Sequence, residues 1–372
     1  MNVIHVAYNP SHYGVGTFLL NLMECQKNRY PDLCPAAAFQ APGSNAKAFE
    51  SLAIPIYGLG HRSARNIRSL LLFYRIFKKY DLVNFHGASP LAFLAAKLAG
   101  KKTIYTFHGA LGLRGNARDC VVKAFHYFVL PKACDYITFA SDASLARFRE
   151  GFPGIQIKPI KYSIIPYGIL LHKVRANLKR EDVRTARKWK DKFVIGTISM
   201  IHPVKRLEYL VESFSRMKGR EGCALVIIGD GDKDYERDLR GFVRRQKLEK
   251  DVEFLGRYDL PEVYNLANAF DLFVSSSKIE TFGLALLEAM VLGVPCIVVD
   301  GSGGAIDILG KSGLIVKTID EMSQAMDLLK GDISLRTRIS ASVKKRAEEF
   351  DISKTADEFR IIYERLMGST RP

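Results

Sequence analysis

Short apolar runs alternate with longer amphipathic stretches along most of this 372-residue chain. The apolar run at residues 3–8 is followed by an amphipathic stretch at residues 16–28, and the run at residues 82–85 by a stretch at residues 90–99. Apolar runs without polar alternation are typical of parallel strands that are covered on both faces. The sequence therefore predicts an α/β fold in which parallel strands alternate with helices.

The alternation stops once and then starts again, which indicates two domains. After residues 164–168 the pattern weakens into a charged stretch at residues 173–192, and a strand-like run restarts it at residues 193–198. A chain of this length also exceeds one ordinary core. We expect two Rossmann-like domains that face a cleft, at residues 1–168 and 180–350. Helical spacing at residues 351–367 predicts a last helix that can pack back on the first domain.

Composition excludes several classes of protein. No run of about 18 apolar residues occurs, and the first residues lack the basic and apolar plan of a signal peptide, so we expect a cytoplasmic protein. The 6 cysteines form no C-x-x-C pair, and the histidines lack metal-binding spacing. Neither a zinc site nor a disulfide framework is therefore expected, and we predict neither a metal nor a cofactor.

Positive charge is concentrated in the first half of the chain. The net charge is +16, and residues 1–170 hold 20 Lys and Arg against 8 Asp and Glu. This fits an anionic partner such as a membrane surface, a phosphorylated acceptor or nucleic acid, although general solubility remains an alternative. Residues 61–80 predict a basic amphipathic helix, which either lies on anionic lipid or packs its apolar face on the sheet.

The segment at residues 277–290 is the strongest candidate for a ligand site. Glu280 is expected in a loop at the end of a strand, a helix should begin near Gly283 and Leu284, and Glu288 lies about one turn into that helix. The start of a helix binds phosphate readily, and a carboxylate nearby suits ribose hydroxyls. The alternative is an ordinary helix with Glu288 paired to a surface lysine.

Seven residues separate Glu280 from Glu288, and the segment resembles the E-x7-E signature of the retaining family-4 glycosyltransferases of the GT-B fold. Residues 225–232, 252–258 and 266–271 resemble the neighbouring elements of that family. The resemblance implies that Glu288 binds the ribose, that Glu280 contacts the sugar, and that the helix start at Gly283 and Leu284 binds the diphosphate.

Two parts of the first half also resemble the family. Gly14 and Gly16, after the first strand, resemble its glycine-rich loop near the donor phosphates, although glycines also make tight turns. His108 resembles the histidine that contacts the transferred sugar, and His86 ends the preceding strand in the same way. We expect both histidines to face the cleft; the alternative for each is a hydrogen-bonded structural residue.

The loop after the first strand of the second half both resembles and departs from the family. Lys205 matches the lysine that binds the donor diphosphate. Met200 stands where the family usually has an arginine, so one phosphate contact is missing. Arg206 stands where a glycine is usual and can supply the missing charge, although a Lys-Arg pair is also common on solvated surfaces.

The resemblance implies a retaining, metal-independent glycosyltransferase that moves a sugar from a nucleotide-sugar to an acceptor. The acceptor could be a glycan or a lipid-linked precursor, with peripheral contact at the inner face of the membrane through the basic first domain. Two alternatives remain: a nucleotide-sugar binding protein without transferase activity, and a nucleotide-sugar epimerase. Nucleic acid is not expected as a partner, because no aromatic platform or basic-helix module occurs.

Overall fold

The computed structural model describes residues 1–10, 14–41, 43, 45–58, 67–87, 90–109, 125, 129–151 and 161–368. The chain divides into two compact units, each of which is considered by itself. Unit 1 contains Met1–Leu170 and Phe350–Pro372, and unit 2 contains Leu171–Glu349. The first unit is thus built from two separate stretches of the chain.

Unit 1 contains a parallel sheet with the order β3-β2-β1-β4-β5-β6-β7. The order runs outward in both directions from the pair β1 and β4, as in a Rossmann sheet. The described strands are β1 Asn2–Ala7, β2 Cys34–Phe39, β3 Ile56–Gly58, β4 Leu82–His86, β5 Lys102–Phe107, β6 Tyr136–Phe139 and β7 Tyr162–Ile164.

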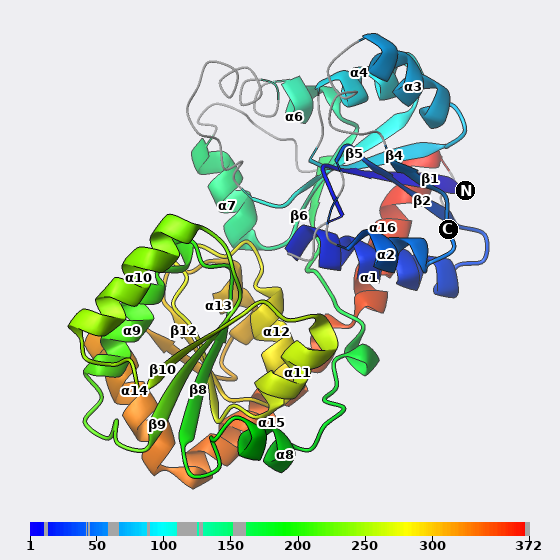
Figure 1. The fold of residues 1–372 in the computed structure, drawn as a ribbon. Coiled ribbons are helices and arrows are strands. Elements are labelled where there is room, and N and C mark those ends of the chain that lie inside the picture. The colour runs from blue at the N-terminus through cyan, green and yellow to red at the C-terminus, as the bar shows by residue number, and fades with distance from the viewer. Residues whose placement is uncertain are drawn as a thin grey trace. The chain divides into compact units, whose positions relative to one another are not determined.

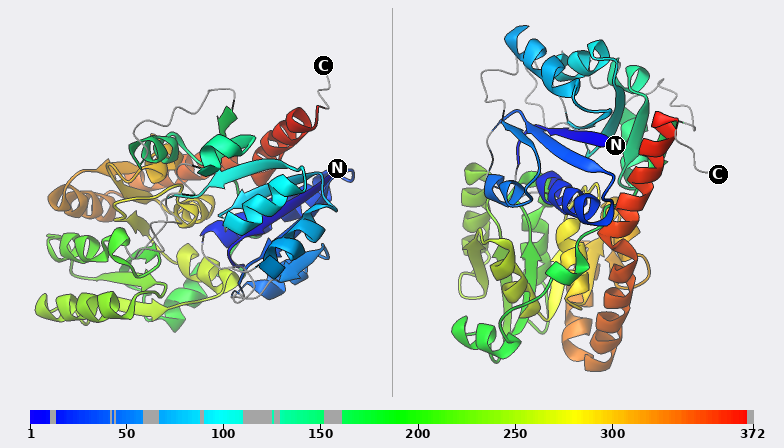
Figure 2. Two further views of the ribbon diagram at one scale, coloured as in Figure 1. Left: turned by 90° about the horizontal axis from the view of Figure 1, so that it is seen from above. Right: turned by 90° about the vertical axis from the view of Figure 1, so that its right-hand side faces the viewer.

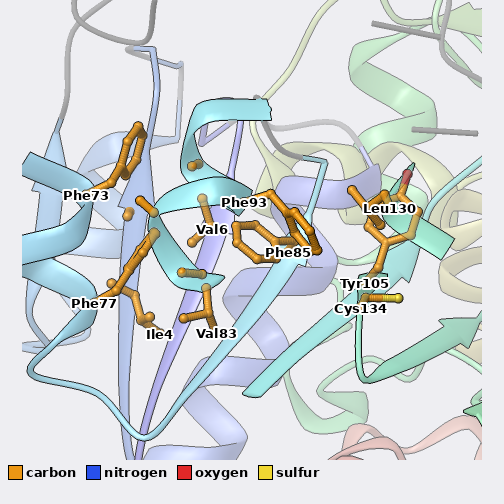
Figure 3. Close-up of a cluster of buried hydrophobic side chains, with 14 of the residues drawn as sticks. Ile4, Val6, Phe73, Phe77, Val83, Phe85, Phe93, Tyr105, Leu130 and Cys134 are labelled. Atoms are coloured by element: carbon orange, nitrogen blue, oxygen red, sulfur yellow. The ribbon is translucent and has the colours of Figure 1, made fainter. Parts of the chain in front are cut away.

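Helices cover both faces of this sheet, with α3 and α4 on one face and α1 and α16 on the other (Figure 1). The first face is apolar: Phe73 and Phe77 of α3 pack against Val83 and Phe85 of β4 in a cluster that excludes water (Figure 3). The described helices are α1 Gly14–Arg29, α2 Ala46–Glu50, α3 Ile67–Phe77, α4 Pro90–Leu98, α6 Leu130–Ala133, α7 Asp142–Gly151 and α16 Ile352–Met367.

The last helix, α16, lies beside α1, and two views of the ribbon agree on this (Figures 1 and 2). Arg29 of α1 donates to Asp357 of α16 through Nε at 3.0 Å and Nη2 at 3.1 Å. Phe359 and Tyr363 are buried on the apolar face of α16. The helical spacing read in the sequence therefore corresponds to a real buried face.

Unit 2 repeats the same plan with the strand order β10-β9-β8-β11-β12-β13, all parallel. Its strands are β8 Phe193–Ile198, β9 Cys223–Ile228, β10 Val252–Gly256, β11 Leu272–Ser275, β12 Cys296–Val299 and β13 Leu314–Val316. Its α-helices are α8 Arg180–Ala186, α9 Leu207–Ser215, α10 Lys233–Arg245, α11 Leu260–Asn268, α12 Leu284–Val291, α13 Gly304–Leu309, α14 Ile319–Gly331 and α15 Ile333–Ala347.

The charged stretch at residues 173–192, which carries no strand-helix pattern in the sequence, contains helix α8. Arg180 and Arg184 of this helix bind Asp271 with N···O distances of 2.6 and 3.0 Å. Asp271 also accepts from the backbone N–H of Val194, so the helix is held by polar contacts to the start of β8 and β11. A helix that is held by ion pairs and not by an apolar face shows no apolar periodicity in its sequence.

The described cysteines are all free: Cys25, Cys134, Cys223 and Cys296 are buried and Cys34 is exposed. Cys120 lies outside the described residues. No helix in the described part of the chain has the length and apolar character that a membrane span would require.

Candidate active site

The loops that follow β8 and β11 in unit 2 hold the residues with the strongest site signals. These two strands are neighbours, and the strand order reverses between them. Open α/β sheets bind ligands at the carboxyl ends of the strands at such a switch point. Lys205 lies in the loop after β8, and Glu280 lies in the loop after β11. The topology therefore brings the two predicted residues to one edge of the sheet.

Lys205 and Glu280 are in direct contact. The Lys205 ammonium donates to Oε1 of Glu280, and both side chains are 18% exposed. The Ser277 hydroxyl donates to the same Oε1 at 2.8 Å. A partly buried ion pair with a further hydrogen bond holds both charged ends in one geometry. A cation and a carboxylate are thus placed together at the switch point.

Backbone contacts hold the two loops against each other. The Ser276 hydroxyl donates to the Lys205 carbonyl at 2.8 Å, and the backbone N–H of Lys278 donates to Val204 at 3.0 Å. On the other side, the N–H of Glu280 donates to the Ser302 carbonyl at 2.7 Å. These hydrogen bonds therefore fix the backbone of Lys205 and the backbone of Glu280 relative to each other.

Helix α12 begins immediately after this loop, as the sequence predicts. Gly283 occupies the N-cap position with φ 112° and ψ 58°, a conformation that residues with a Cβ rarely adopt. Leu284 is the first residue of the helix. The first backbone N–H groups of any helix have no partner within it, so this end can donate to an anion near Glu280.

Glu288 lies on α12 and is 6% exposed. Burial raises the pKa of its carboxyl to about 7, partly opposed by the Tyr264 hydroxyl, which donates to Oε1 at 3.3 Å. The surface lysine of the alternative interpretation is therefore not its partner in the structure. A buried carboxyl with a strongly shifted pKa near a sheet edge is a typical feature of a functional site.

Arg206 follows Lys205 in the left-handed conformation, with φ 46° and ψ 49°. This explains why a glycine is usual at this position, since only glycine adopts that backbone freely. The guanidinium donates to the Ser276 carbonyl at 3.2 Å and lies 4.6 Å from the centroid of the Tyr209 ring. Met200, at the usual arginine position, is half-buried.

The two predicted histidines of unit 1, His86 and His108, lie at the ends of β4 and β5. His86 Nδ1 is 2.8 Å from His108 Nε2, and Nδ1 of His108 is 2.6 Å from the Tyr167 hydroxyl. His108 is half-buried, and burial lowers the pKa of its ring to about 3. A ligand can reach a ring nitrogen of His108 only by replacing one of these partners.

The contacts of His86 favour the alternative interpretation, that of a hydrogen-bonded structural residue. His86 is 4% exposed, and its Nε2 is 3.0 Å from Nδ1 of His5. The reason is its register: it points to the face of the sheet that α1 covers, where Phe18 packs against it with ring centroids 6.1 Å apart. His86 is therefore a hydrogen-bonded structural residue, which was the alternative.

The predicted glycines of unit 1 lie in the first turn of α1. Gly14 is exposed, and within the described residues a Cβ built on it would meet no atom within 4 Å. Gly16 is buried in the same turn. Tyr13, which precedes them, lies outside the described residues.

The sequence missed the partners of the site rather than its charged residues. Ser277 and Tyr264 bind the two glutamates, and Tyr167, His5 and Gln26 complete the hydrogen bonds around the histidines. The sequence contains one signal for these partners: His5 is a polar residue inside the apolar run at residues 3–8. In the part of the chain that is described, no group of three or more His, Cys, Asp or Glu side chains is arranged to hold a metal.

Both halves of the chain match models of known families. Residues 13–173 match the model described as Glycosyltransferase Family 4, and residues 179–346 match the model described as Glycosyl transferases group 1. Each match begins and ends within or close to one unit of the structure, so the two together account for most of the chain.

Curated relatives have similar lengths. The chain is 26% identical over 316 residues to UDP-Gal:alpha-D-GlcNAc-diphosphoundecaprenol alpha-1,3-galactosyltransferase of Escherichia coli, covering 80% of this chain and 79% of the relative. It is 27% identical over 302 residues to N-acetyl-alpha-D-glucosaminyl L-malate synthase of Bacillus anthracis, covering 76% of this chain and 74% of that one.

Solved structures share the fold. HepE (Alr3699) of Anabaena, in complex with UDP and glucose, superposes with a TM-score of 0.86 at 18% identity, covering 98% of this chain and 100% of that chain. WaaG, a glycosyltransferase involved in lipopolysaccharide biosynthesis, gives 0.74 at 16% identity, covering 97% and 99%. The predicted fold class and enzyme class are thereby confirmed, and the chain belongs to the family-4 glycosyltransferases of the GT-B fold.

Proposed function

We propose that the protein is a retaining glycosyltransferase that takes a sugar from a nucleotide-sugar bound by unit 2. The observation that carries the proposal is the Lys205–Glu280 ion pair at the start of α12, with Glu288 further along the same helix. A nucleotide-sugar presents a ribose, a diphosphate and a sugar in that order. Glu288, the helix start with Lys205, and Glu280 offer complementary groups to the three parts.

Negative charge develops on the nucleoside diphosphate as the bond to the sugar breaks. In our proposal the Lys205 ammonium and the N–H groups at the start of α12 stabilise this charge, so the reaction needs neither a metal nor a cofactor. Glu280 would release Lys205 to the diphosphate and accept hydrogen bonds from the sugar hydroxyls. Arg206 lies close enough in the same loop to add a second positive charge where Met200 provides none.

The activities of related proteins suggest the range of partners. The galactosyltransferase of Escherichia coli acts with UDP-Gal on a sugar linked to diphosphoundecaprenol, and the structure of HepE contains UDP and glucose. We propose a UDP-sugar as donor and a glycan or lipid-linked glycan as acceptor, with unit 1 binding the acceptor. The basic character of residues 1–170 suits an acceptor that carries phosphate.

A binding experiment tests the donor site directly. We expect one nucleotide-sugar, in a panel of UDP, GDP and ADP conjugates, to raise the melting temperature of the protein, and Glu288→Gln to abolish this shift. The ribose hydroxyls should bind the ionised carboxylate, whose pKa is about 7. Affinity should therefore rise about tenfold between pH 6 and pH 8 in the wild type.

A nucleotide-sugar is the right probe for this pH series, because its diphosphate diester does not titrate in that range. Glu262→Gln, on the neighbouring helix α11, is the matched control. It should bind and respond to pH as the wild type does. Stabilisation that survives in Glu288→Gln, or an affinity that falls with rising pH, would contradict the proposed role of Glu288.

A second candidate function is nucleotide-sugar binding without transfer, which Met200 favours. Loss of one cation from the diphosphate site reduces the stabilisation of the leaving group more than it reduces ground-state binding. Tight binding of a nucleotide-sugar, together with no release of nucleotide in the presence of lipid-linked or polysaccharide acceptors, would select this alternative.

We also propose that unit 1 contacts an anionic membrane from the cytoplasmic side. Helix α3 buries Phe73 and Phe77 against the sheet (Figure 3), as the packing interpretation predicts. It leaves Leu71 53% exposed and Leu72 41% exposed. The same outer face carries Arg68 and Arg75. The adjacent helix α4 exposes two more leucines, Leu94 and Leu98.

Exposed leucines between arginines fit the boundary of an anionic bilayer. We expect the protein to sediment with vesicles that contain about 30% phosphatidylglycerol and not with pure phosphatidylcholine. Arg68→Gln with Arg75→Gln should weaken binding at least about tenfold, and Leu71→Ser with Leu72→Ser should do so as well. Leu328→Ser, which removes a half-exposed leucine of unit 2, is the control. Equal binding to both kinds of vesicle would disprove the electrostatic part.

A further inference from the structure

A chain of hydrogen-bonded polar side chains runs through unit 1 beneath α1. It begins on α16, where the Tyr363 hydroxyl accepts from Nε2 of Gln26 at 3.2 Å. Oε1 of Gln26 is 3.1 Å from Nε2 of His5, and Nδ1 of His5 is 3.0 Å from Nε2 of His86. From His86 the chain continues to His108. Five side chains from α16, α1, β1, β4 and the end of β5 are thus connected.

The amide of Gln26 determines which atom donates and which accepts in each hydrogen bond of this series. Its oxygen faces His5, so Nε2 of His5 carries a hydrogen and Nδ1 accepts. His86 must then donate through Nε2 and accept through Nδ1, and the same step places the hydrogen of His108 on Nε2. Nδ1 of His108 therefore keeps a lone pair, to which the Tyr167 hydroxyl donates at 2.6 Å.

The surroundings preserve this arrangement. Phe18 of α1 stacks on the Tyr167 ring with centroids 3.9 Å apart and lies edge-on to His108 at 5.7 Å. Burial lowers the pKa of His5 to about 4 and that of His108 to about 3, so the rings stay neutral at physiological pH. A neutral ring has one N–H, and its position is set by the bond that the other nitrogen makes.

We propose that Gln26 and Tyr363 are positioning residues for sugar transfer, because they fix His108 as a hydrogen-bond acceptor at Nδ1. The inference rests on the proposed function and on the family resemblance, which implies that His108 contacts the transferred sugar. A sugar hydroxyl that replaces Tyr167 meets a lone pair on His108, so the histidine orients the sugar by accepting from it and does not supply a proton. The last helix contributes to this through Tyr363.

The tautomers can be observed without any activity. With 15N-labelled histidine and long-range proton–nitrogen correlation, we expect His5, His86 and His108 of the wild type to show hydrogen on Nε2. Gln26→Leu removes the oxygen that sets the direction, and a second population with hydrogen on Nδ1 should then appear at His108. Hydrogen on Nδ1 of His108 in the wild type would overturn the inference, as would unchanged tautomers in Gln26→Leu.

Kinetics provide the second test. Tyr363→Phe removes one oxygen atom, which frees the Gln26 amide to rotate, and it keeps the test available where Gln26→Leu does not fold. We expect kcat to fall about tenfold while the KM for the nucleotide-sugar changes less than about twofold. Tyr136→Phe is the matched control, since Tyr136 is also buried in unit 1 but its hydroxyl bonds only to Ser163 among the contacts described.

The outcomes separate this inference from the proposed function. If Tyr363→Phe and Tyr136→Phe have equal effects on kcat, the chain is structural and the inference is overturned. If the wild type transfers no sugar from any donor, the proposed function fails, and the tautomer spectra still decide whether Gln26 sets the state of His108.

Discussion

Lys205→Met should lower kcat/KM for sugar transfer by about a hundredfold to a thousandfold, the effect expected when one preorganised group that stabilises transition-state charge is removed. Lys205 is 18% exposed, its ammonium is held by Glu280, and its carbonyl is held by Ser276. In the proposed reaction the ammonium passes from Glu280 to the diphosphate, while the backbone of its loop stays in place. With Met200 at the usual arginine position, Arg206 is the one other cation in this loop, so little compensation is expected.

The measurement is an initial-rate series with the donor that stabilises the wild type. Lys278→Met is the matched control, since Lys278 is exposed in the neighbouring loop and its backbone, not its side chain, holds that loop. It should retain activity within about threefold. A loss below tenfold in Lys205→Met, or an equal loss in Lys278→Met, would show that Lys205 does not stabilise the leaving group.

Gly229→Ala should destabilise unit 2 by about 3 to 5 kcal/mol. Gly229 follows β9 directly and has φ 138°, and an added Cβ would lie 2.0 Å from the carbonyl oxygen of Ser199. Both the backbone conformation and the space are therefore unsuitable for a side chain. Because Ser199 begins the loop that carries Lys205, relief of this contact should also disturb the site.

Trp189 is the only tryptophan of the chain and is fully buried in unit 2, so its fluorescence follows the unfolding of this unit. The melting temperature should fall by about 10 °C in Gly229→Ala. Gly222→Ala separates the two causes, since Gly222 has φ 71° but no described atom within 4 Å of an added Cβ. Gly241→Ala in α10 should be neutral or slightly stabilising. An equal loss in Gly222→Ala would mean that the contact with Ser199 contributes nothing.

Much of unit 2 could be predicted because its signals are local. The E-x7-E spacing places Glu280 and Glu288 on either side of a helix start, and Gly283 caps that helix as expected. The ion pair between Lys205 and Glu280 could not be predicted, because it depends on β8 and β11 being neighbours in the sheet. In sequence, the strands β9 and β10 and the helices α9, α10 and α11 lie between them. The sequence shows that Lys205 and Glu280 are present, but it does not show the strand order that brings them together.

The polar chain in unit 1 was missed for a related reason. A histidine in an apolar run looks like an isolated exception to the strand pattern, and Gln26 looks like a polar residue on the outer face of a helix. Both are fully buried, since α16 covers α1. Gln26 bonds to Tyr363, which is 337 positions away in sequence, and such a contact depends on the tertiary structure. Patterns of polar and apolar residues identify buried faces only where those faces are apolar. The buried face beneath α1 is partly polar, so the patterns do not reveal it.

Unit 1 is built from two separate stretches of the chain, and this sets the order in which the protein can be completed on the ribosome. The ribosome must add all of unit 2 after Leu170 before it makes α16. At about 5–20 residues per second, this interval lasts on the order of 10 to 40 seconds. During it, α1 and the polar chain lack the cover of Phe359 and Tyr363. The first sheet can therefore be covered on this face only after α16 has been made, whereas unit 2, which is continuous, can fold as soon as it emerges.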